Sequence, residues 1–183
     1  MKLKNYLWIC LAIAIIGLTS CFTQPNPSNL SPAQKRETTL QAVTLDKAKI
    51  VMGQTVYVPI YSHIYHYNSQ DNVMNLSATL SVRNTDLTNS IIITSIRYYD
   101  TDGKLIRQDV ERPVALKPLA STSFFIAADD TSGGAGANFI VEWVAEKRVS
   151  EPVIEAVMIN TSSSQGISFV SPGRVLKQHN NKN

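Results

Sequence analysis

The chain has 183 residues, a length that suits one domain of roughly 100–150 residues together with a tail. With 44% hydrophobic, 17% charged and 8% aromatic residues, it can bury a core and is neither disordered nor fibrous. Lys and Arg number 17 against 14 Asp and Glu, and Lys2 and Lys4 precede a segment that we expect to be removed. The balance of 15 (17 minus 2) to 14 leaves a charge of +1, which argues against nucleic acid as a partner.

The first 20 residues resemble a secretory signal. A basic start is followed by an uncharged apolar run over 7–18, which is shorter than the ~20 residues that a membrane-spanning helix needs. The run ends in Leu18-Thr19-Ser20-Cys21, which resembles the bacterial lipobox, in which the cysteine receives a diacylglycerol. We therefore expect residues 1–20 to be a lipoprotein signal peptide and Cys21 to carry the lipid. The alternative is ordinary cleavage near Ser20, which would leave a free thiol.

The cysteine count limits the chemistry of the mature chain. The only other cysteine, Cys10, lies in the apolar run and would be removed with it. Without a second cysteine, disulfides, thiol catalysis and cysteine-based zinc sites are excluded. We expect no cofactor.

Composition divides the rest of the chain into three parts. Residues 21–49 are rich in Pro, Ser and Asn and are predicted to be the lipidated cysteine followed by a flexible tether. Residues 50–175 are predicted to form the folded domain, and residues 176–183 a disordered polar tail.

A period of two dominates the predicted domain, as expected for half-buried strands. The clearest alternation runs over 76–83, and the turn Asp100 to Gly103 predicts a hairpin between strands at 91–99 and 104–110. Further strands are predicted at 122–127, 139–145, 153–159 and 166–170. We expect an all-β immunoglobulin- or fibronectin-like sandwich of about seven or eight antiparallel strands, with an open barrel as the alternative. The predicted core is Leu76, Ala78, Leu80, Val82, Phe139, Val141 and Trp143.

Several separated motifs resemble one bacterial lipoprotein family. They are Tyr57 to Tyr65, Ser81 to Asp86, Tyr98 to Gly103, Gly136 to Phe139, Glu155 to Ile159 and Gln165 to Phe169. The family is the uncharacterised domain of unknown function 3124 of cyanobacteria and some proteobacteria. The resemblance implies an exported, mostly β domain without an assigned activity, so it supplies no catalytic residues.

Two histidines are weak candidates for a metal site. His63 and His66 are three residues apart, so on a regular strand they point to opposite faces and bind one ion only if the chain turns between them. Asp71, Asp129 or Asp130 would have to complete the site. Structural or surface roles are the better interpretation, and we predict no metal.

Aromatic rings with polar tips alternate between Tyr57 and Tyr67. If this strand is regular, Tyr57, Tyr61, His63, Tyr65 and Tyr67 line one face and could bind a sugar or a partner chain. The alternative is an aromatic edge of the core. Pro59 lacks an N–H and predicts an edge strand, to which a partner could add a strand.

The loop from Asp129 to Asn138 is the most unusual segment. Asp129 and Asp130 would suit a hard cation, whereas Gly133, Gly134 and Gly136 would let backbone amides approach an anion, and neither signature is complete. A flexible loop without a ligand is the alternative interpretation.

Two functional hypotheses remain, because no segment carries a catalytic signature. The first is a non-enzymatic binding module of the cell envelope, anchored to the inner or outer membrane by its lipid, that docks a protein or polymer. Its surface would include Tyr57, Tyr61, His63, Tyr65, Asp129, Asp130, Gly133, Gly134 and Asn138. The second is a small-ligand or metal carrier, or a minor enzyme, that uses His63, His66 and the Asp129 to Asn138 loop.

Overall fold

The computed structural model describes residues 40–179, which form thirteen β-strands and one short 3-10 helix, η2 (Lys47–Lys49). The strands are β1 (Gln41–Ala42), β2 (Met52–Pro59), β3 (His63–His66), β4 (Ser69–Asn75), β5 (Ser77–Arg83), β6 (Ile91–Tyr99), β7 (Leu105–Val110), β8 (Val114–Leu116), β9 (Ser121–Ile126), β10 (Asn138–Ala145), β11 (Val153–Asn160), β12 (Ile167–Pro172) and β13 (Arg174–Gln178). The predicted signal peptide, Cys21 and most of the tether lie outside the described residues. Within residues 40–179, no helix is long and apolar enough to cross a membrane.

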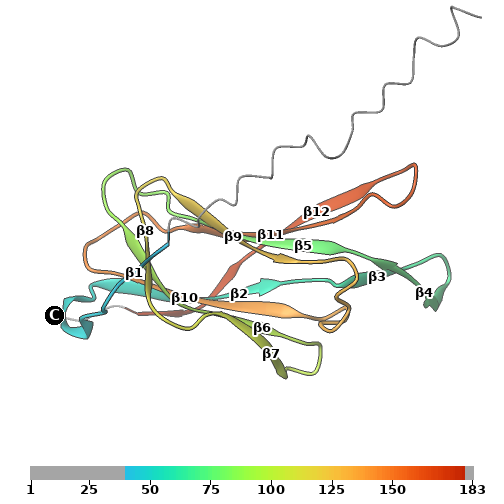
Figure 1. The fold of residues 1–183 in the computed structure, drawn as a ribbon, viewed down its shortest axis with the longest axis horizontal. Coiled ribbons are helices and arrows are strands. Elements are labelled where there is room, and N and C mark those ends of the chain that lie inside the picture. Colours follow the sequence, from blue (N-terminus) through green and yellow to red (C-terminus); the bar gives the residue numbers. More distant parts are fainter. Residues whose placement is uncertain (1–39, 180–183) are drawn as a thin grey trace, which may run out of the picture. The chain divides into compact units, whose positions relative to one another are not determined.

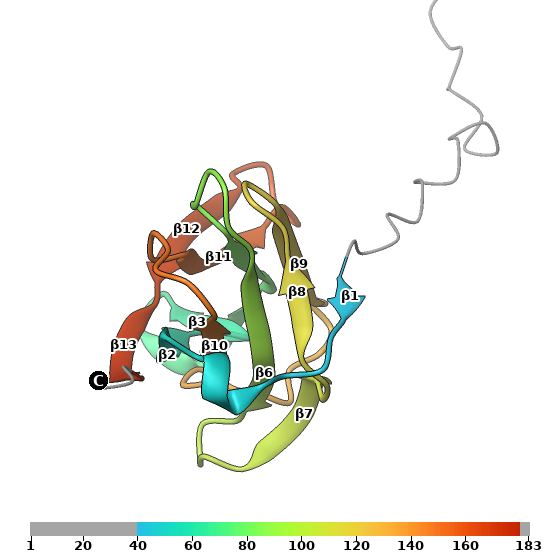
Figure 2. The ribbon, with the colours of Figure 1, turned by 90° about the vertical axis from the view of Figure 1, so that its left-hand side faces the viewer.

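The strands form a β-sandwich of antiparallel sheets (Figure 1). The larger sheet has seven strands in the order β1-β8-β6-β10-β2-β13, with β7 also paired to β6, and the smaller sheet has the order β12-β11-β5-β9. Figure 2 shows β13 on one side of the domain and β7 and β8 on the other, as this order requires. The prediction of an all-β sandwich is confirmed, and no closed barrel forms among the described strands.

The core lies between the two sheets, where inward-facing residues of both sheets pack into one cluster. All seven predicted core residues are at most 1% exposed. Trp143 is fully buried, and its indole Nε1 donates to Gln54 Oε1 at 3.3 Å. The alternation that predicted strands at 76–83 and 139–145 therefore also identified the correct faces.

The predicted hairpin at residues 91–110 is confirmed as β6 and β7. Asp100 organises its turn, because Asp100 Oδ1 accepts hydrogen bonds from the backbone N–H groups of Asp102 at 3.0 Å and Lys104 at 2.8 Å. Gly103 takes a φ of 79°, a left-handed conformation that suits glycine. The turn residues thus form the hairpin turn that the sequence predicted.

Paired strands extend past both expected ends of the domain. The tether prediction of 21–49 includes β1, which pairs with β8, and the tail prediction of 176–183 includes the end of β13, which pairs with β2. Every residue of β1 and of β13 is exposed, so neither strand shows the alternation of apolar and polar residues that reveals a half-buried strand. Backbone pairing holds both segments.

Candidate functional site

The predicted single strand from Tyr57 to Tyr67 is broken. β2 ends at Pro59, and β3 begins at His63. In the break, the Ile60 N–H donates to the Ala137 carbonyl at 2.9 Å, and the Ser62 N–H donates to the Gly134 carbonyl at 3.0 Å. The aromatic residues therefore do not form one continuous stripe along a regular strand.

The edge-strand prediction from Pro59 is wrong for β2, which lies between β10 and β13. Pro59 pairs with Asn138 of β10, whereas the pairing with β13 reaches only as far as Tyr57 opposite Arg174. Because Pro59 lies past the end of β13, its missing N–H removes no ladder bond on that side. The proline marks the end of a strand rather than the edge of a sheet.

The aromatic residues separate into two groups. Tyr57 is half-buried on β2, whereas Tyr65 and Tyr67 are 52% and 86% exposed on the hairpin made by β3 and β4. Tyr61 lies between these groups and packs edge-on against Phe169 of β12, with ring centroids 5.8 Å apart. Among these aromatic residues, those on the hairpin have the most exposed rings.

The β3–β4 hairpin extends beyond the two main sheets (Figure 1). Within residues 40–179, its strands pair only with each other, with a register irregularity between Tyr65 and His66. Asn160 Nδ2 at the end of β11 donates to the Asn75 carbonyl at 2.6 Å and so ties the base of the hairpin to the smaller sheet. The tip has no comparable support from the sheets.

His63 and His66 have separate environments. The His63 ring lies 5.5 Å from the Tyr65 ring, and the His66 ring lies 4.4 Å from the Tyr67 ring. Within residues 40–179, no group of three or more His, Cys, Asp or Glu side chains could hold a metal ion. Each imidazole therefore has a tyrosine ring as a neighbour.

The loop between β9 and β10 is tied down, in contrast to the flexible alternative. Thr101 Oγ1 donates to the Gly133 carbonyl at 3.0 Å and accepts from the Gly136 N–H at 3.0 Å. Asp130 Oδ1 accepts from Ser132 Oγ at 2.5 Å, within the loop. Asp130, Gly133 and Gly136 thus have structural partners, and the loop lies between the β6–β7 turn and the break after β2.

An open cavity of about 590 Å³ lies at the base of the β3–β4 hairpin. We call it the hairpin cavity; its lining residues are His66, Val73, Met74, Asn75, Ala128, Asp129, Asn160 and Ser162. His66 and Asp129, two residues singled out from the sequence, meet here. Asn138 and Tyr57 do not, because both lie on paired strands of the larger sheet. The lining from β4 and from the turn after β11 carried no sequence signal, since only the fold brings these segments together.

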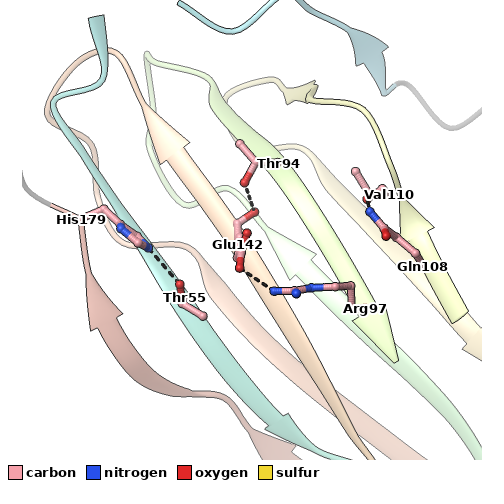
Figure 3. A network of polar contacts seen from close by, with 7 residues as sticks. All are labelled: Thr55, Thr94, Arg97, Gln108, Val110, Glu142 and His179. Atoms are coloured by element: carbon pink, nitrogen blue, oxygen red, sulfur yellow. Dashed lines mark hydrogen bonds and ion pairs between the residues drawn. The ribbon is translucent and has the colours of Figure 1, made fainter. Parts of the chain in front are cut away.

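The outer face of the larger sheet carries a polar network that sequence reasoning missed. Arg97 Nη2 on β6 lies 2.6 Å from Glu142 Oε1 on β10, and Thr55 Oγ1 on β2 lies 2.9 Å from His179 Nε2 (Figure 3). Arg97 and Glu142 are only 30% and 35% exposed, so this ion pair is partly shielded from solvent. Only the register of β6 against β10 would have revealed this pair.

One of the quoted family motifs has a clear structural role. Asn84 Nδ2 donates to the backbone carbonyls of Leu116, Lys117 and Asn89 at 2.9 to 3.1 Å. Backbone N–H groups of Thr88, Asn89 and Ser150 donate to Asp86 and lower its pKa from 3.8 to about 2. This motif stabilises the loop between β5 and β6.

One family model matches most of the folded domain. The family model described as "Protein of unknown function (DUF3124)" matches residues 53–176. The chain belongs to this family. The match runs from within β2 to within β13, and the predicted resemblance to the domain of unknown function 3124 is thereby confirmed.

Other comparisons add little to the family assignment. None of the curated proteins matches this chain. The chain is similar to the solved structure described as "Crystal Structure of Thermotoga maritima 1070", at 12% sequence identity and a TM-score of 0.37. That similarity covers 66% of this chain and 92% of the other.

Proposed function

We propose that this member of the DUF3124 family is a non-enzymatic binding module, exported and held at the membrane of the cell envelope by a lipid on Cys21. Its partner is an envelope protein, which docks on the β3–β4 hairpin and the hairpin cavity. The anchor rests on the lipobox-like Leu18-Thr19-Ser20-Cys21.

The exposed tip of the hairpin carries this proposal. Tyr67 is 86% exposed and has a φ of 55°, a left-handed conformation that is unfavourable for a bulky non-glycine residue. The Tyr67 ring lies in solvent. Neither the ring nor its unfavourable backbone conformation therefore stabilises the core. Tyrosine is enriched in protein interfaces, where its ring gives contact area and its hydroxyl a hydrogen bond. The position favours a role in recognition.

The surroundings of Tyr67 support the same role. Tyr65 is 52% and Val73 47% exposed on the same hairpin, and the 590 Å³ hairpin cavity lies beside them. Exposed aromatic and aliphatic side chains next to a concave surface provide the anchors and the pocket that protein interfaces use. His66 and Asp129 add polar groups to the lining.

The substitution Tyr67→Asn removes the exposed ring without destabilising the fold, because asparagine tolerates the left-handed conformation better than tyrosine. Its effect on docking can therefore be measured apart from any effect on folding. We expect the full chain carrying Tyr67→Asn to melt at an equal or higher temperature than wild type. With a photo-crosslinking amino acid at Tyr65, we expect one adduct with an envelope protein in intact cells, which Tyr67→Asn weakens.

Leu119 is the matched control site. It is 66% exposed, and its N–H donates to the Asp86 carbonyl, in the loop at the far end of β5 from the hairpin. A crosslinker at Leu119 should not give the Tyr65 adduct. Equal adducts from both positions, or an adduct that Tyr67→Asn leaves unchanged, would contradict docking through the hairpin.

A small-ligand or metal carrier is the second candidate, because His66 and Asp129 line the same cavity. Elemental analysis of the purified full chain distinguishes the two functions. Stoichiometric metal that is lost in His66→Ala would favour the carrier, whereas metal-free protein that still forms the Tyr65 adduct would favour the binding module.

A further inference from the structure

Three loops lie together at the end of the sandwich that is opposite the β3–β4 hairpin (Figure 1). Arg83, the last residue of β5, pairs with Ser121 at the start of β9 and with Val153 at the start of β11, so the loops next to these residues meet at one end of the smaller sheet. We call the three loops the loop end. They are the β5–β6 loop (residues 84–90), the β8–β9 loop (117–120) and the β10–β11 loop (146–152).

Two exposed leucines lie on neighbouring loops of the loop end. Leu87 is 76% exposed in the β5–β6 loop, and Leu119 is 66% exposed in the β8–β9 loop. The Leu119 N–H donates at 3.2 Å to the carbonyl of Asp86, the residue before Leu87. Leu119 has a φ of 57°, a left-handed conformation that is unfavourable for leucine. Neither side chain is part of the core, so their exposure favours a role at an interface.

Side-chain hydrogen bonds fix the three loops to one another. Asn84 Nδ2 donates to the Lys117 carbonyl at 3.1 Å and joins the β5–β6 loop to the β8–β9 loop. The Ser150 N–H donates to Asp86 Oδ2 at 3.0 Å and joins the β5–β6 loop to the β10–β11 loop. A surface that is fixed before binding loses little conformational entropy when it binds. The loop end is therefore a preformed surface.

Three exposed cations accompany the leucines. Lys117, Lys147 and Arg148 take part in none of the ion pairs found within residues 40–179. Lys117 is two residues from Leu119, and Lys147 lines an open cavity together with Thr88, the residue after Leu87. Exposed apolar side chains beside Lys and Arg are the combination that binds an anionic lipid surface, because insertion and attraction to the headgroups add.

The two ends of the sandwich differ in charge. The loop end and the segment 43–51, which lines the same open cavity, carry five Lys or Arg residues against four Asp or Glu. The hairpin end carries one Lys against five Asp in its segments, which are 60–75, 100–104, 127–137 and 161–166. An anionic surface therefore repels the hairpin end and favours contact with the loop end.

The chain also enters the domain at the loop end. β1 is antiparallel to β8, with Gln41 opposite Ala115, so Leu40 lies beside the end of β8 and next to the β8–β9 loop. Residues 22–39 connect Leu40 to Cys21, the predicted site of lipid attachment. An anchor keeps the domain close to the membrane, so that contact between the two is intramolecular and even a weak contact is populated.

We propose that the loop end binds the anionic lipid surface of the membrane that holds the anchor. The two leucines insert between the headgroups, and the three cations bind the headgroup phosphates. This inference rests on the lipid anchor at Cys21, which belongs to the proposed function, and it goes beyond that function because it gives the domain an orientation. The β3–β4 hairpin then faces away from the membrane, toward its envelope partner.

A nitroxide at Leu119→Cys measures this contact in the full lipidated chain, reconstituted in vesicles of phosphatidylcholine and phosphatidylglycerol in equal parts. With Cys21 acylated and Cys10 removed, the introduced cysteine is the only thiol that can be labelled. Collisions of the nitroxide with oxygen, which partitions into lipid, and with a water-soluble nickel complex report its depth.

Tyr67→Cys is the matched control position. Tyr67 and Leu119 are both exposed apolar residues with a positive φ, and they lie at opposite ends of the sandwich. We expect the ratio of oxygen to nickel collisions to be severalfold higher at Leu119 than at Tyr67.

A nitroxide at Leu87→Cys tests the apolar and the charged contacts separately. Leu119→Asn should reduce the depth without unfolding the chain, because asparagine tolerates the left-handed conformation. Lys147→Glu/Arg148→Glu, vesicles of phosphatidylcholine alone and high salt should each reduce it too, because they weaken the attraction to the phosphates. Lys104→Glu, at an exposed lysine of the hairpin end, is the matched control and should leave the depth unchanged.

Mass spectrometry of the same sample shows whether Cys21 carries lipid. A lipidated chain whose nitroxide at Leu119 is as accessible to nickel as the one at Tyr67 overturns the inference and leaves the anchor standing. Equal immersion of both positions, or immersion that neutral vesicles and the charge reversals leave unchanged, overturns it as well. A chain without lipid that still inserts Leu119 into anionic vesicles overturns only the anchor, and one that does not bind overturns both.

A protein is the competing occupant of the loop end. A photo-crosslinker at Leu119 in intact cells should give adducts with lipid alone. A defined protein adduct at Leu119 would assign the loop end to a protein partner and overturn the membrane contact. Crosslinking at Tyr65 tests the hairpin separately, so docking can fail without the membrane contact and the membrane contact without docking.

Discussion

The hydroxyl oxygens of Ser62 and Tyr98 lie 3.1 Å apart, and both residues are 0% exposed. Ser62 belongs to the break after β2, and Tyr98 belongs to β6 of the larger sheet. Burial raises the pKa of the Tyr98 hydroxyl, which therefore stays protonated and able to donate. The contact fixes the point where the chain leaves the larger sheet and begins the β3–β4 hairpin.

Gly133 lies against the same tyrosine, and Gly133→Ala is expected to destabilise the fold. A Cβ at Gly133 would meet the Tyr98 hydroxyl oxygen and would lie 2.7 Å from the Ala137 Cβ. Overpacking of this kind costs about 1–3 kcal/mol, measurable as a lower free energy of unfolding in urea.

The double variant Gly133→Ala/Tyr98→Phe tests the cause. Removal of the hydroxyl takes away the closest clash, so the double variant should be more stable than the sum of the two single effects predicts. Gly166→Ala is the matched control, because its Cβ would have its nearest contact at 3.5 Å. Strict additivity of the two substitutions would assign the destabilisation to another contact.

Trp143→Ala is expected to cost about 3–5 kcal/mol of unfolding free energy, a large part of the stability of a typical domain. Trp143 is fully buried between the sheets and donates a hydrogen bond to Gln54. Phe125→Ala provides the comparison, since Phe125 is 60% exposed and its loss should change stability by less than about 1 kcal/mol. A Trp143→Ala variant that melts within a degree or two of wild type would show that the core assignment is wrong.

Alternation predicted the fold well because most strands bury one face. β5 and β10 alternate over most of their length, and sequence identified both their positions and their inward faces. β1 and β13 expose every residue, so their positions depend on backbone pairing with β8 and β2, which no residue pattern records. The sequence pattern therefore did not identify these two strands as parts of the domain.

The break after β2 could not be predicted by the same means. Val56, Val58, Ile60 and Ser62 are all buried, so the period of two continues through the break. The chain turns there because Gly134 and Tyr98, from distant segments, supply hydrogen-bond partners. The hairpin cavity could not be predicted from sequence either, because β4 and the turn after β11 carry no motif that marks them as neighbours.

The low pKa of Asp86 predicts that the folded protein loses stability in acid. Its pKa is about 2 in the folded protein against a usual 3.8, so folding favours the ionised form. The stabilisation is complete above about pH 4 and is lost as pH falls toward 2, through the folded pKa. Urea unfolding between pH 5 and 2 should show this decline, and Asp86→Asn should flatten it. Asp129→Asn, in another loop, is the control, and an Asp86→Asn variant with the wild-type pH profile would contradict the assignment.

Cys21 is expected to carry the lipid. Cys21→Ser should abolish acylation and leave uncleaved precursor, because the thiol is the group that is alkylated before cleavage. Mass spectrometry of the membrane fraction measures both changes. Cys10→Ser is the matched control, since Cys10 lies within the segment that is removed. Normal lipid-modified product from Cys21→Ser would refute the anchor.

The residues that the sequence predicted as recognition surface lie in two places. Substitutions at these two places should affect docking differently. Asp129 lines the hairpin cavity, whereas Asn138 begins β10 and pairs with Pro59 and Tyr99 on the larger sheet. With the crosslinker at Tyr65, we expect Asp129→Ala to reduce the adduct and Asn138→Ala to leave it unchanged. Each should alter stability by at most about 0.5 kcal/mol, because neither side chain packs in the core.

Loss of the adduct in Asn138→Ala, with Asp129→Ala unaffected, would place recognition on the outer face of the larger sheet instead. The residues to substitute next would then be the Arg97–Glu142 pair on β6 and β10 (Figure 3) and Tyr57 on the neighbouring strand β2. A purified chain that turns over a defined substrate, with activity lost on substitution of His63, His66 or Asp129, would instead contradict a binding module. Docking needs only the exposed rings and the concave surface, whereas turnover needs a nucleophile or base held by a partner.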